Sequence, residues 1–162
     1  LDFPTREVKE AFKTYLISDY SAIPQEIVGA NVFQMAKAIK AEDIQHFMDL
    51  LKTFFAAVQY DVAIDTEGRF QLLFYSVFLL LGVRVEAESR TCDGRIDAVI
   101  QEGDCIYIFE FKMNQNAEAA LAQIREKKYY QKYQHAGKKI ILIGANFDAA
   151  SRQISEWKIE EA

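Results

Sequence analysis

Hydrophobic spacing divides the chain into a helical first part and a mixed second part, with the change near residue 60. Before that point, apolar residues recur every three or four positions, which is the period of an amphipathic helix. Pro24 interrupts this pattern once. The spacing predicts three helices, over residues 6–20, 27–39 and 42–57.

After residue 60 the pattern becomes that of an α/β protein. Residues 66–81 are apolar on nearly every side, which predicts a helix buried on most of its surface. Residues 116–133 predict a further helix, and strand-type runs occupy 83–89, 95–101, 105–112, 138–144 and 154–159. We therefore expect a core of order α-β-β-β-α-β, with a mixed central sheet flanked by helices. The predicted domains are an all-helical N-terminal segment, 1–60, and this core, 61–162.

One predicted hairpin brings three charged residues to the same face of the sheet. Centring its turn on Glu102 and Gly103 places Asp97 opposite Ile108. Opposed residues of an antiparallel pair share a face, and side chains alternate along a strand. Asp97, Glu110 and Lys112 should therefore project to one side.

Such a cluster suits a divalent metal ion. Two carboxylates and an ammonium group on an apolar strand carry a desolvation cost unless they are paired, hydrated or bound to metal. Mg²⁺ takes one or two carboxylates and keeps several waters, and Mn²⁺ is a substitute. Lys112 beside the ion could orient or deprotonate a water, or stabilise charge on a phosphate. The alternative is a buried Glu110–Lys112 ion pair with Asp97 in a turn.

Composition narrows the class of protein. The chain has 162 residues, of which 51% are hydrophobic, and two cysteines without metal-ligand spacing. No apolar run is long enough to cross a bilayer, and no secretory signal is present, so we expect a cytoplasmic protein. The chain begins with Leu1 and not Met, which indicates a fragment or a processed chain.

Charge gives a mixed indication about partners. The net charge of −5 argues against a nucleic-acid partner. Residues 120–162, however, carry 8 basic and 5 acidic residues. Basic residues interleaved with tyrosines suit a nucleic-acid backbone and its bases, and the competing interpretation is a solvated amphipathic helix.

Two segments resemble the PD-(D/E)XK nuclease superfamily: Gly94-Arg95-Ile96-Asp97, and Ile108-Phe109-Glu110-Phe111-Lys112. Together with Ala120–Ile124 and Gly137–Lys139, they look like the nuclease-like domain found C-terminal to an AAA-type ATPase domain in many bacterial proteins. The resemblance is strongest over residues 67–159 and implies a restriction-endonuclease-like core. It also implies an upstream ATPase domain as a partner.

The resemblance further implies Mg²⁺-dependent phosphodiester hydrolysis of nucleic acid, DNA before RNA, by metal-activated water. The metal ligands it implies are Glu67, Asp97 and Glu110, and the catalytic residues are Asp97, Glu110, Lys112 and Gln123. For Glu67 the alternative is a first-turn glutamate beside the helix dipole, and for Gln123 a solvent-exposed helix residue. The candidate nucleic-acid contacts are Arg95, Arg125, Lys127, Lys128 and Lys132.

Two other functions stay open at this point. The fold could serve as a catalytically silent module that binds nucleic acid or protein for the associated ATPase. The acidic cluster could also be incidental to a purely structural domain. The sequence predicts no oligomeric state and does not separate exonuclease from endonuclease action.

Overall fold

The computed structural model describes residues 25–58, 73–74, 76–78, 80–81, 84–86 and 98–162. The chain forms two compact units, Leu1–Gly82 and Val83–Ala162. The predicted helix over 6–20 and three predicted site residues, Glu67, Arg95 and Asp97, lie outside the described residues. The domain division at residue 60 stays a prediction.

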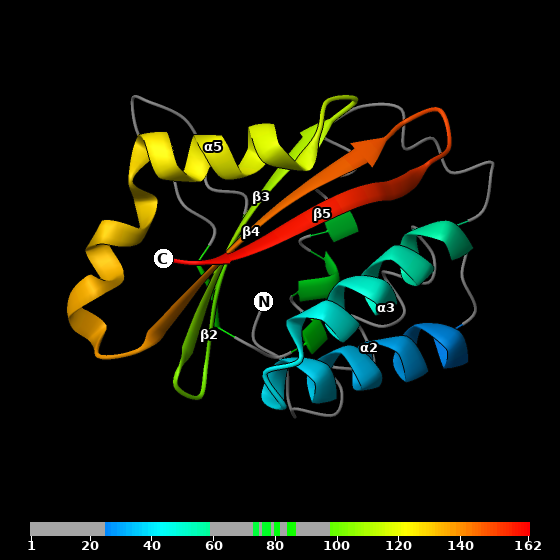
Figure 1. Ribbon diagram of the computed structural model, residues 1–162. Helices are drawn as coiled ribbons and strands as arrows, with labels where there is room; N and C mark the ends of the chain where they lie inside the picture. Colours follow the sequence, from blue (N-terminus) through cyan, green and yellow to red (C-terminus); the bar gives the residue numbers. More distant parts are fainter. Residues whose placement is uncertain (1–24, 59–72, 75, 79, 82–83, 87–97) are drawn as a thin grey trace, which may run out of the picture. The chain divides into compact units, whose positions relative to one another are not determined.

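The first unit contains the helical hairpin that the sequence predicts. Helix α2 spans Gln25–Lys40 and α3 spans Ile44–Ala57 (Figure 1). The Asp43 side chain caps α3 by accepting a hydrogen bond from the His46 backbone N–H at 3.1 Å. The predicted apolar stripe of α3 is buried at Phe47, Leu51 and Phe54. The two predictions over 27–39 and 42–57 are thus confirmed.

The apolar run after residue 60 is helical wherever it is described between residues 73 and 81. Phe78 of this run packs edge-on against Phe47 of α3, with ring centroids 5.8 Å apart, and also contacts Phe74. The helix predicted over 66–81 is confirmed for these positions, and its described apolar residues are buried as expected.

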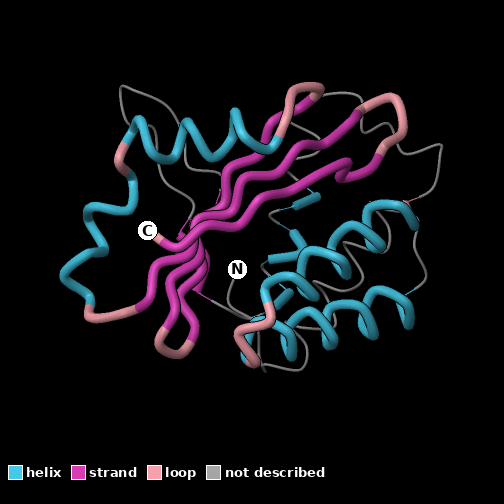
Figure 2. The backbone as a smooth tube through the Cα atoms, viewed as in Figure 1, coloured by secondary structure: helices cyan, strands magenta, loops and turns pink. Residues whose placement is uncertain are grey.

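The second unit is built on a five-stranded mixed sheet in the order β1-β2-β3-β4-β5 (Figure 2). The strands are β1 Arg84–Glu86, β2 Ala98–Glu102, β3 Cys105–Met113, β4 Lys139–Asp148 and β5 Gln153–Glu161. Strands β3 and β4 are parallel, and the other neighbours are antiparallel. The element order therefore confirms the predicted α-β-β-β-α-β core.

The β2–β3 hairpin has a different register from the predicted one. Its turn is centred on Gly103 and Asp104, and Gly103 has a φ of +55°. Glu102 consequently pairs with Cys105, and Val99, not Asp97, lies opposite Ile108. The shift is two residues, so it preserves the faces of the strands. The glycine decides the centre because its φ is one that other residues adopt at a cost.

The helix after β3 is shorter than predicted. Helix α5 spans Ala117–Lys127, and the 3-10 helix η1 follows over Tyr129–Ala136. Lys128 lies between them with a φ of +51°, in the left-handed region that ends an α-helix. The continuous helix predicted over 116–133 is therefore wrong at its C-terminal end.

Helix α5 covers one face of the sheet at short range. Its Leu121 and Ile124 join a buried cluster with Ile106 and Ile108 of β3. The close approach depends on Gly144 of β4, where an added Cβ would lie 2.5 Å from the Ala117 carbonyl oxygen and 2.7 Å from the Leu121 nitrogen. The predicted strand over 138–144, apolar on both faces, is buried as expected from Ile140 to Phe147.

Candidate active site

Glu110 of β3 is a buried acid on the α5 face of the sheet. Side chains alternate along a strand, and Ile106 and Ile108 face α5, so Glu110 and Lys112 face it too. Glu110 is only 2% exposed. A carboxylate in this position carries a large desolvation cost unless charged or hydrogen-bonding groups surround it.

Two polar side chains hold this carboxylate. The Lys112 Nζ lies 3.5 Å from Glu110 Oε1, and the Gln123 Nε2 of α5 donates a hydrogen bond to the same oxygen. Lys112 also donates a hydrogen bond to the Gln123 Oε1. We name these three residues the Glu110–Lys112–Gln123 cluster. Gln123 is half-buried and faces the strand, so the alternative of a solvent-exposed residue is wrong.

The start of α5 is fixed by hydrogen bonds that place Gln123 over β3. Asn116 caps the helix by accepting from the Ala119 backbone N–H at 2.7 Å. The Glu156 Oε1 of β5 accepts from the Ala117 N–H at 2.8 Å. An acid at a helix N-terminus is favourable because it also meets the positive end of the helix dipole.

Asn146 of β4 holds the loop between β3 and α5 in place. This residue was not identified from the sequence. Its Oδ1 accepts from the Gln115 backbone N–H at 2.8 Å, and its Nδ2 donates to the Ser155 Oγ at 2.9 Å. It pairs in register with Lys112. The available signal was a single amide residue inside a run of apolar residues, since a buried polar group requires partners.

The basic residues predicted to bind nucleic acid lie in different surroundings. Arg125 is bound by two acids: its Nη1 lies 2.9 Å from Glu118 Oε1, and its Nε donates to Glu160 Oε1 at 3.2 Å. These hydrogen bonds, Glu160 before Glu118, raise the pKa of the Arg125 guanidinium. Lys158 of β5 also pairs with Glu118, with Nζ and Oε2 2.9 Å apart.

The two glutamates respond to the same contacts. Hydrogen bonds from Lys158, and then from Arg125, lower the pKa of Glu118. The hydrogen bond from Arg125 lowers the pKa of Glu160. We call Glu118, Arg125, Lys158 and Glu160 the α5–β5 ion-pair network. It lies on the surface, because its side chains are between 40% and 54% exposed.

The other described members of this predicted set, Lys127, Lys128 and Lys132, differ in exposure and in contacts. Lys127, the last residue of α5, is half-buried, and Lys128 is exposed at the turn that follows. The Lys132 Nζ lies over the Tyr133 ring, 4.8 Å from its centroid. The roles of all three in nucleic-acid binding stay predictions.

Glu110 of the cluster offers a carboxylate of the kind that divalent metal ions bind. Buried carboxylate oxygen is the donor that Mg²⁺ and Mn²⁺ accept, and Mg²⁺ is commonly held through one or two carboxylates and several waters. Within the described part of the chain, no group of three or more acidic, histidine or cysteine residues comes together to hold a metal. Glu110 therefore fits as one ligand. The other expected ligands, Asp97 and Glu67, lie outside the described residues.

The mixed sheet, with a helix laid over its parallel pair and an acid-x-Lys pair on the central strand, defines a restriction-endonuclease-like α/β protein. Residues 65–157 match the family model of the PD-(D/E)XK nuclease superfamily. The chain belongs to this superfamily.

A relative from Azotobacter chroococcum mcd 1, "Uncharacterized protein in vnfD 5'region", is 31% identical over 167 residues. The match covers 99% of the present chain but only 32% of that protein, so the chain spans about a third of the relative's length. Across the described residues, no helix has the length and apolar character needed to cross a membrane.

Proposed function

We propose that the chain hydrolyses phosphodiester bonds in nucleic acid, DNA before RNA, with Mg²⁺ or Mn²⁺ as cofactor. Superfamily membership indicates nuclease activity, and one observation supports it for this chain in particular. Glu110 of β3 is only 2% exposed, and it is held by Lys112 of the same strand and by Gln123 of α5. The other residues of the buried part of β3 are apolar on both faces. Hydrophobic residues at these positions would be simpler for a scaffold, so the polar cluster suits a chemical role.

Glu110 would hold the metal ion together with Asp97 and Glu67. When bound, a divalent ion supplies a water nucleophile at neutral pH and neutralises charge on the phosphate. Glu110 keeps one of its oxygens, Oε1, engaged by Gln123 and Lys112. These contacts fix the orientation of the carboxylate, which is how second partners commonly tune a metal ligand.

Lys112 would stabilise the charge that develops on the phosphate. An ammonium group has three N–H donors, and two of them point to Glu110 and Gln123. The third is available for a phosphoryl oxygen. Because Lys112 already donates to a carboxylate and to an amide oxygen, we favour charge stabilisation over its use as a base.

Gln123 would act as a positioning residue. Its amide bridges the other two members, donating to Glu110 and accepting from Lys112. Both ends of the amide are thereby used, so its rotamer is fixed without any charge of its own.

The intact protein would also carry an upstream AAA-type ATPase domain and act in the cytoplasm.

Metal binding and cleavage can be tested separately. Thermal unfolding is measured with and without Mg²⁺ or Mn²⁺ for the wild type, Glu110→Gln and the matched control Glu126→Gln, which changes an exposed α5 acid. Metal at about 100 times its Kd should stabilise the wild type and the control by about 2.7 kcal/mol, and Glu110→Gln much less. An equal effect on all three proteins would remove Glu110 from the metal site.

Cleavage is then measured on linear, supercoiled and single-stranded DNA. Lys112→Ala should keep the metal-dependent stabilisation but lose about 10²–10³-fold in rate, the usual cost of removing one charge-stabilising group. Metal stabilisation without any cleavage would instead favour the catalytically silent module. The absence of both effects in the wild type would contradict the proposed function.

A further inference from the structure

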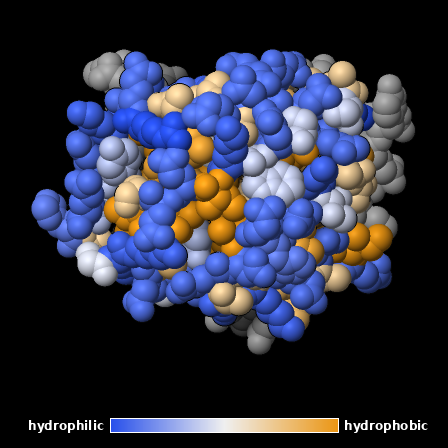
Figure 3. Space-filling view, viewed as in Figure 1, coloured by the Kyte–Doolittle hydropathy of each residue, from blue (hydrophilic) through white to orange (hydrophobic). Residues whose placement is uncertain are grey.

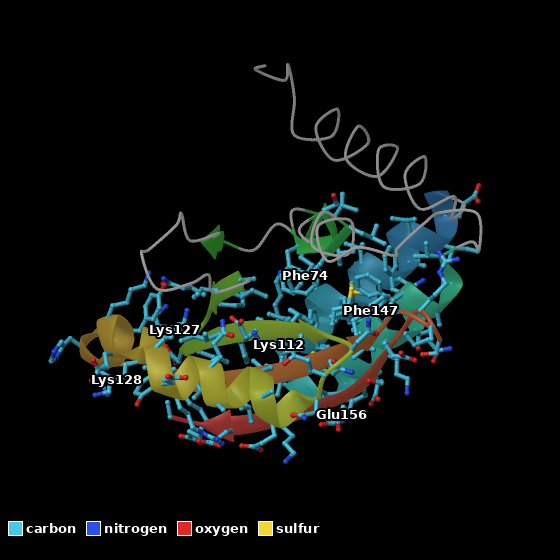
Figure 4. All side chains as sticks on the ribbon, turned by 90° about the horizontal axis from the view of Figure 1, so that it is seen from above. Phe74, Lys112, Lys127, Lys128, Phe147 and Glu156 are labelled. Carbon is cyan, nitrogen blue, oxygen red and sulfur yellow. The ribbon has the colours of Figure 1, made fainter. Side chains whose placement is uncertain are left out.

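Charged residues on the two sides of α5 have different partners: those toward β5 are in ion pairs, whereas Lys127 lies on the side of Gln123. Gln123 and Lys127 are four residues apart, so they lie on the same side of the helix, one above the other. Gln123 contacts Lys112 of β3. In Figure 4, Lys112 and Lys127 are labelled on the β2 side of α5, and Glu156 on the β5 side. Lys127 thus continues the line that begins at the Glu110–Lys112–Gln123 cluster.

The charge of Lys127 is not used within the described residues, where no carboxylate forms an ion pair with it. Arg125, two residues earlier, points to the other side of α5 and is bound by Glu118 and Glu160. Arg125 therefore contributes little net charge for a ligand, although the sequence places it among the same cations. Lys127 and Arg125 are therefore on different sides of α5, and only Arg125 is paired with acids there.

We propose that Lys127 binds a phosphate of the substrate strand next to the phosphate held at Lys112, so that the strand follows α5 toward η1. The inference rests on the proposed function, because it takes Lys112 as the position of the reacting phosphate. One helical turn advances about 5.4 Å, and phosphates of one strand follow each other about every 3.4 Å along a duplex. Gln123 contacts Lys112, and Lys127 lies four residues, about 6 Å, further along the helix axis. Lys127 is therefore within reach of the first or second phosphate next to the one at Lys112.

Lys127 is the last residue of α5 that we assign to the proposed phosphate contacts. Lys128 adopts a left-handed conformation that ends the helix, and its side chain is exposed. It is therefore a matched control: the same residue type, adjacent in the chain, but off the line that Gln123 and Lys127 define. A lysine acts on phosphate as a point charge, so the contact should depend on salt and not on base sequence.

Equilibrium binding tests the proposal without requiring catalysis. The Glu110→Gln protein, alone and with Lys127→Gln or Lys128→Gln added, is titrated with a labelled DNA duplex between about 50 and about 200 mM salt. Lys127→Gln should weaken binding on unrelated sequences alike and reduce the slope of log K against log salt by about 0.9. Lys128→Gln should leave that slope unchanged. Thermal unfolding checks that each variant is folded.

The outcomes separate this inference from the proposed function. A lower slope for Lys127→Gln supports the strand path, even if the wild type cleaves no DNA. Equal slopes for the Lys127 and Lys128 variants overturn it, even if the wild type is an active nuclease. Competition by polyglutamate as strong as that by DNA would also overturn it, because the surface would then favour acidic protein. If none of the three proteins bound DNA, both proposals would be contradicted.

Discussion

Helix α5 meets the sheet through two polar groupings that use the same residue types in opposite ways. Toward β3, the Glu110–Lys112–Gln123 cluster buries an acid to 2% exposure beside one partly exposed lysine. Toward β5, the α5–β5 ion-pair network places two acids and two bases on the surface. The first grouping faces a desolvation cost that the second avoids.

The contrast between the buried cluster and the exposed network shows which charged residues contribute little beyond alignment of the fold. Exposed ion pairs gain little stability, so the α5–β5 network chiefly aligns a helix with an edge strand. A buried ion pair is seldom the most stable solution for a protein core. The pair beneath α5 is therefore the one to which we assign the proposed chemistry.

The largest expected effect comes from a substitution that prevents the close approach of α5 to β4, on which both polar groupings depend. Gly144→Ala would place a methyl group 2.5 Å from the Ala117 carbonyl oxygen. Backbone atoms cannot move aside as flexible side chains do, so we expect a loss of about 3 kcal/mol in the free energy of unfolding. Denaturant titration measures it.

Gly29→Ala is the matched control for this prediction. Nothing lies within 4 Å of an added Cβ at Gly29, which is in helix α2. Alanine is the better helix former, so the control should gain up to about 1 kcal/mol. A Gly144→Ala protein as stable as the wild type would show that α5 can shift away from β4.

The second test removes one lysine from each side of α5. Lys112→Met leaves the Glu110 carboxylate buried without its ammonium partner, and should cost about 2 kcal/mol, below the range for a fully buried pair because Lys112 is 20% exposed. Lys158→Met breaks the exposed pair with Glu118, and its effect on denaturant unfolding should fall within the error of measurement. Equal effects for the two variants would remove the distinction between the sides.

The smallest effect concerns pH and belongs to the β5 side. The pKa values of Glu118 and Glu160 are lowered in the folded chain, so both carboxylates bind protons more weakly than in the unfolded chain. Their contribution to stability is present above the ordinary glutamate pKa of 4.5, and is lost as pH falls through the lowered values.

Urea titrations across this acid range should show a shallower loss of stability for the Glu118→Gln/Glu160→Gln protein than for the wild type. Added salt should reduce the difference, because exposed charges are screened. Glu126→Gln, which changes another acid of α5, controls for net charge. A parallel acid limb for the wild type and the double variant would mean that the network contributes nothing.

The sequence alone determined the kinds of elements, their order and the faces of the strands. The periods of 3.6 and 2 are local properties, so helices α2 and α3 and strands β2 to β5 were predictable. The shared face of Glu110 and Lys112 follows from alternation alone. It did not depend on the hairpin centre, because both residues lie on β3.

The tertiary structure decided which long-range partners meet. These contacts are the close approach of α5 to β4 at Gly144, the bridge from Gln123 to Glu110 and Lys112, and the hydrogen bonds from Arg125 to Glu160. They join residues of different elements that lie 11 to 35 positions apart in the chain. No local period encodes such contacts, because they depend on how a helix is set against a sheet. Periodicity thus places a residue on a face, and packing then decides whether its charge stabilises the fold or is available to a substrate.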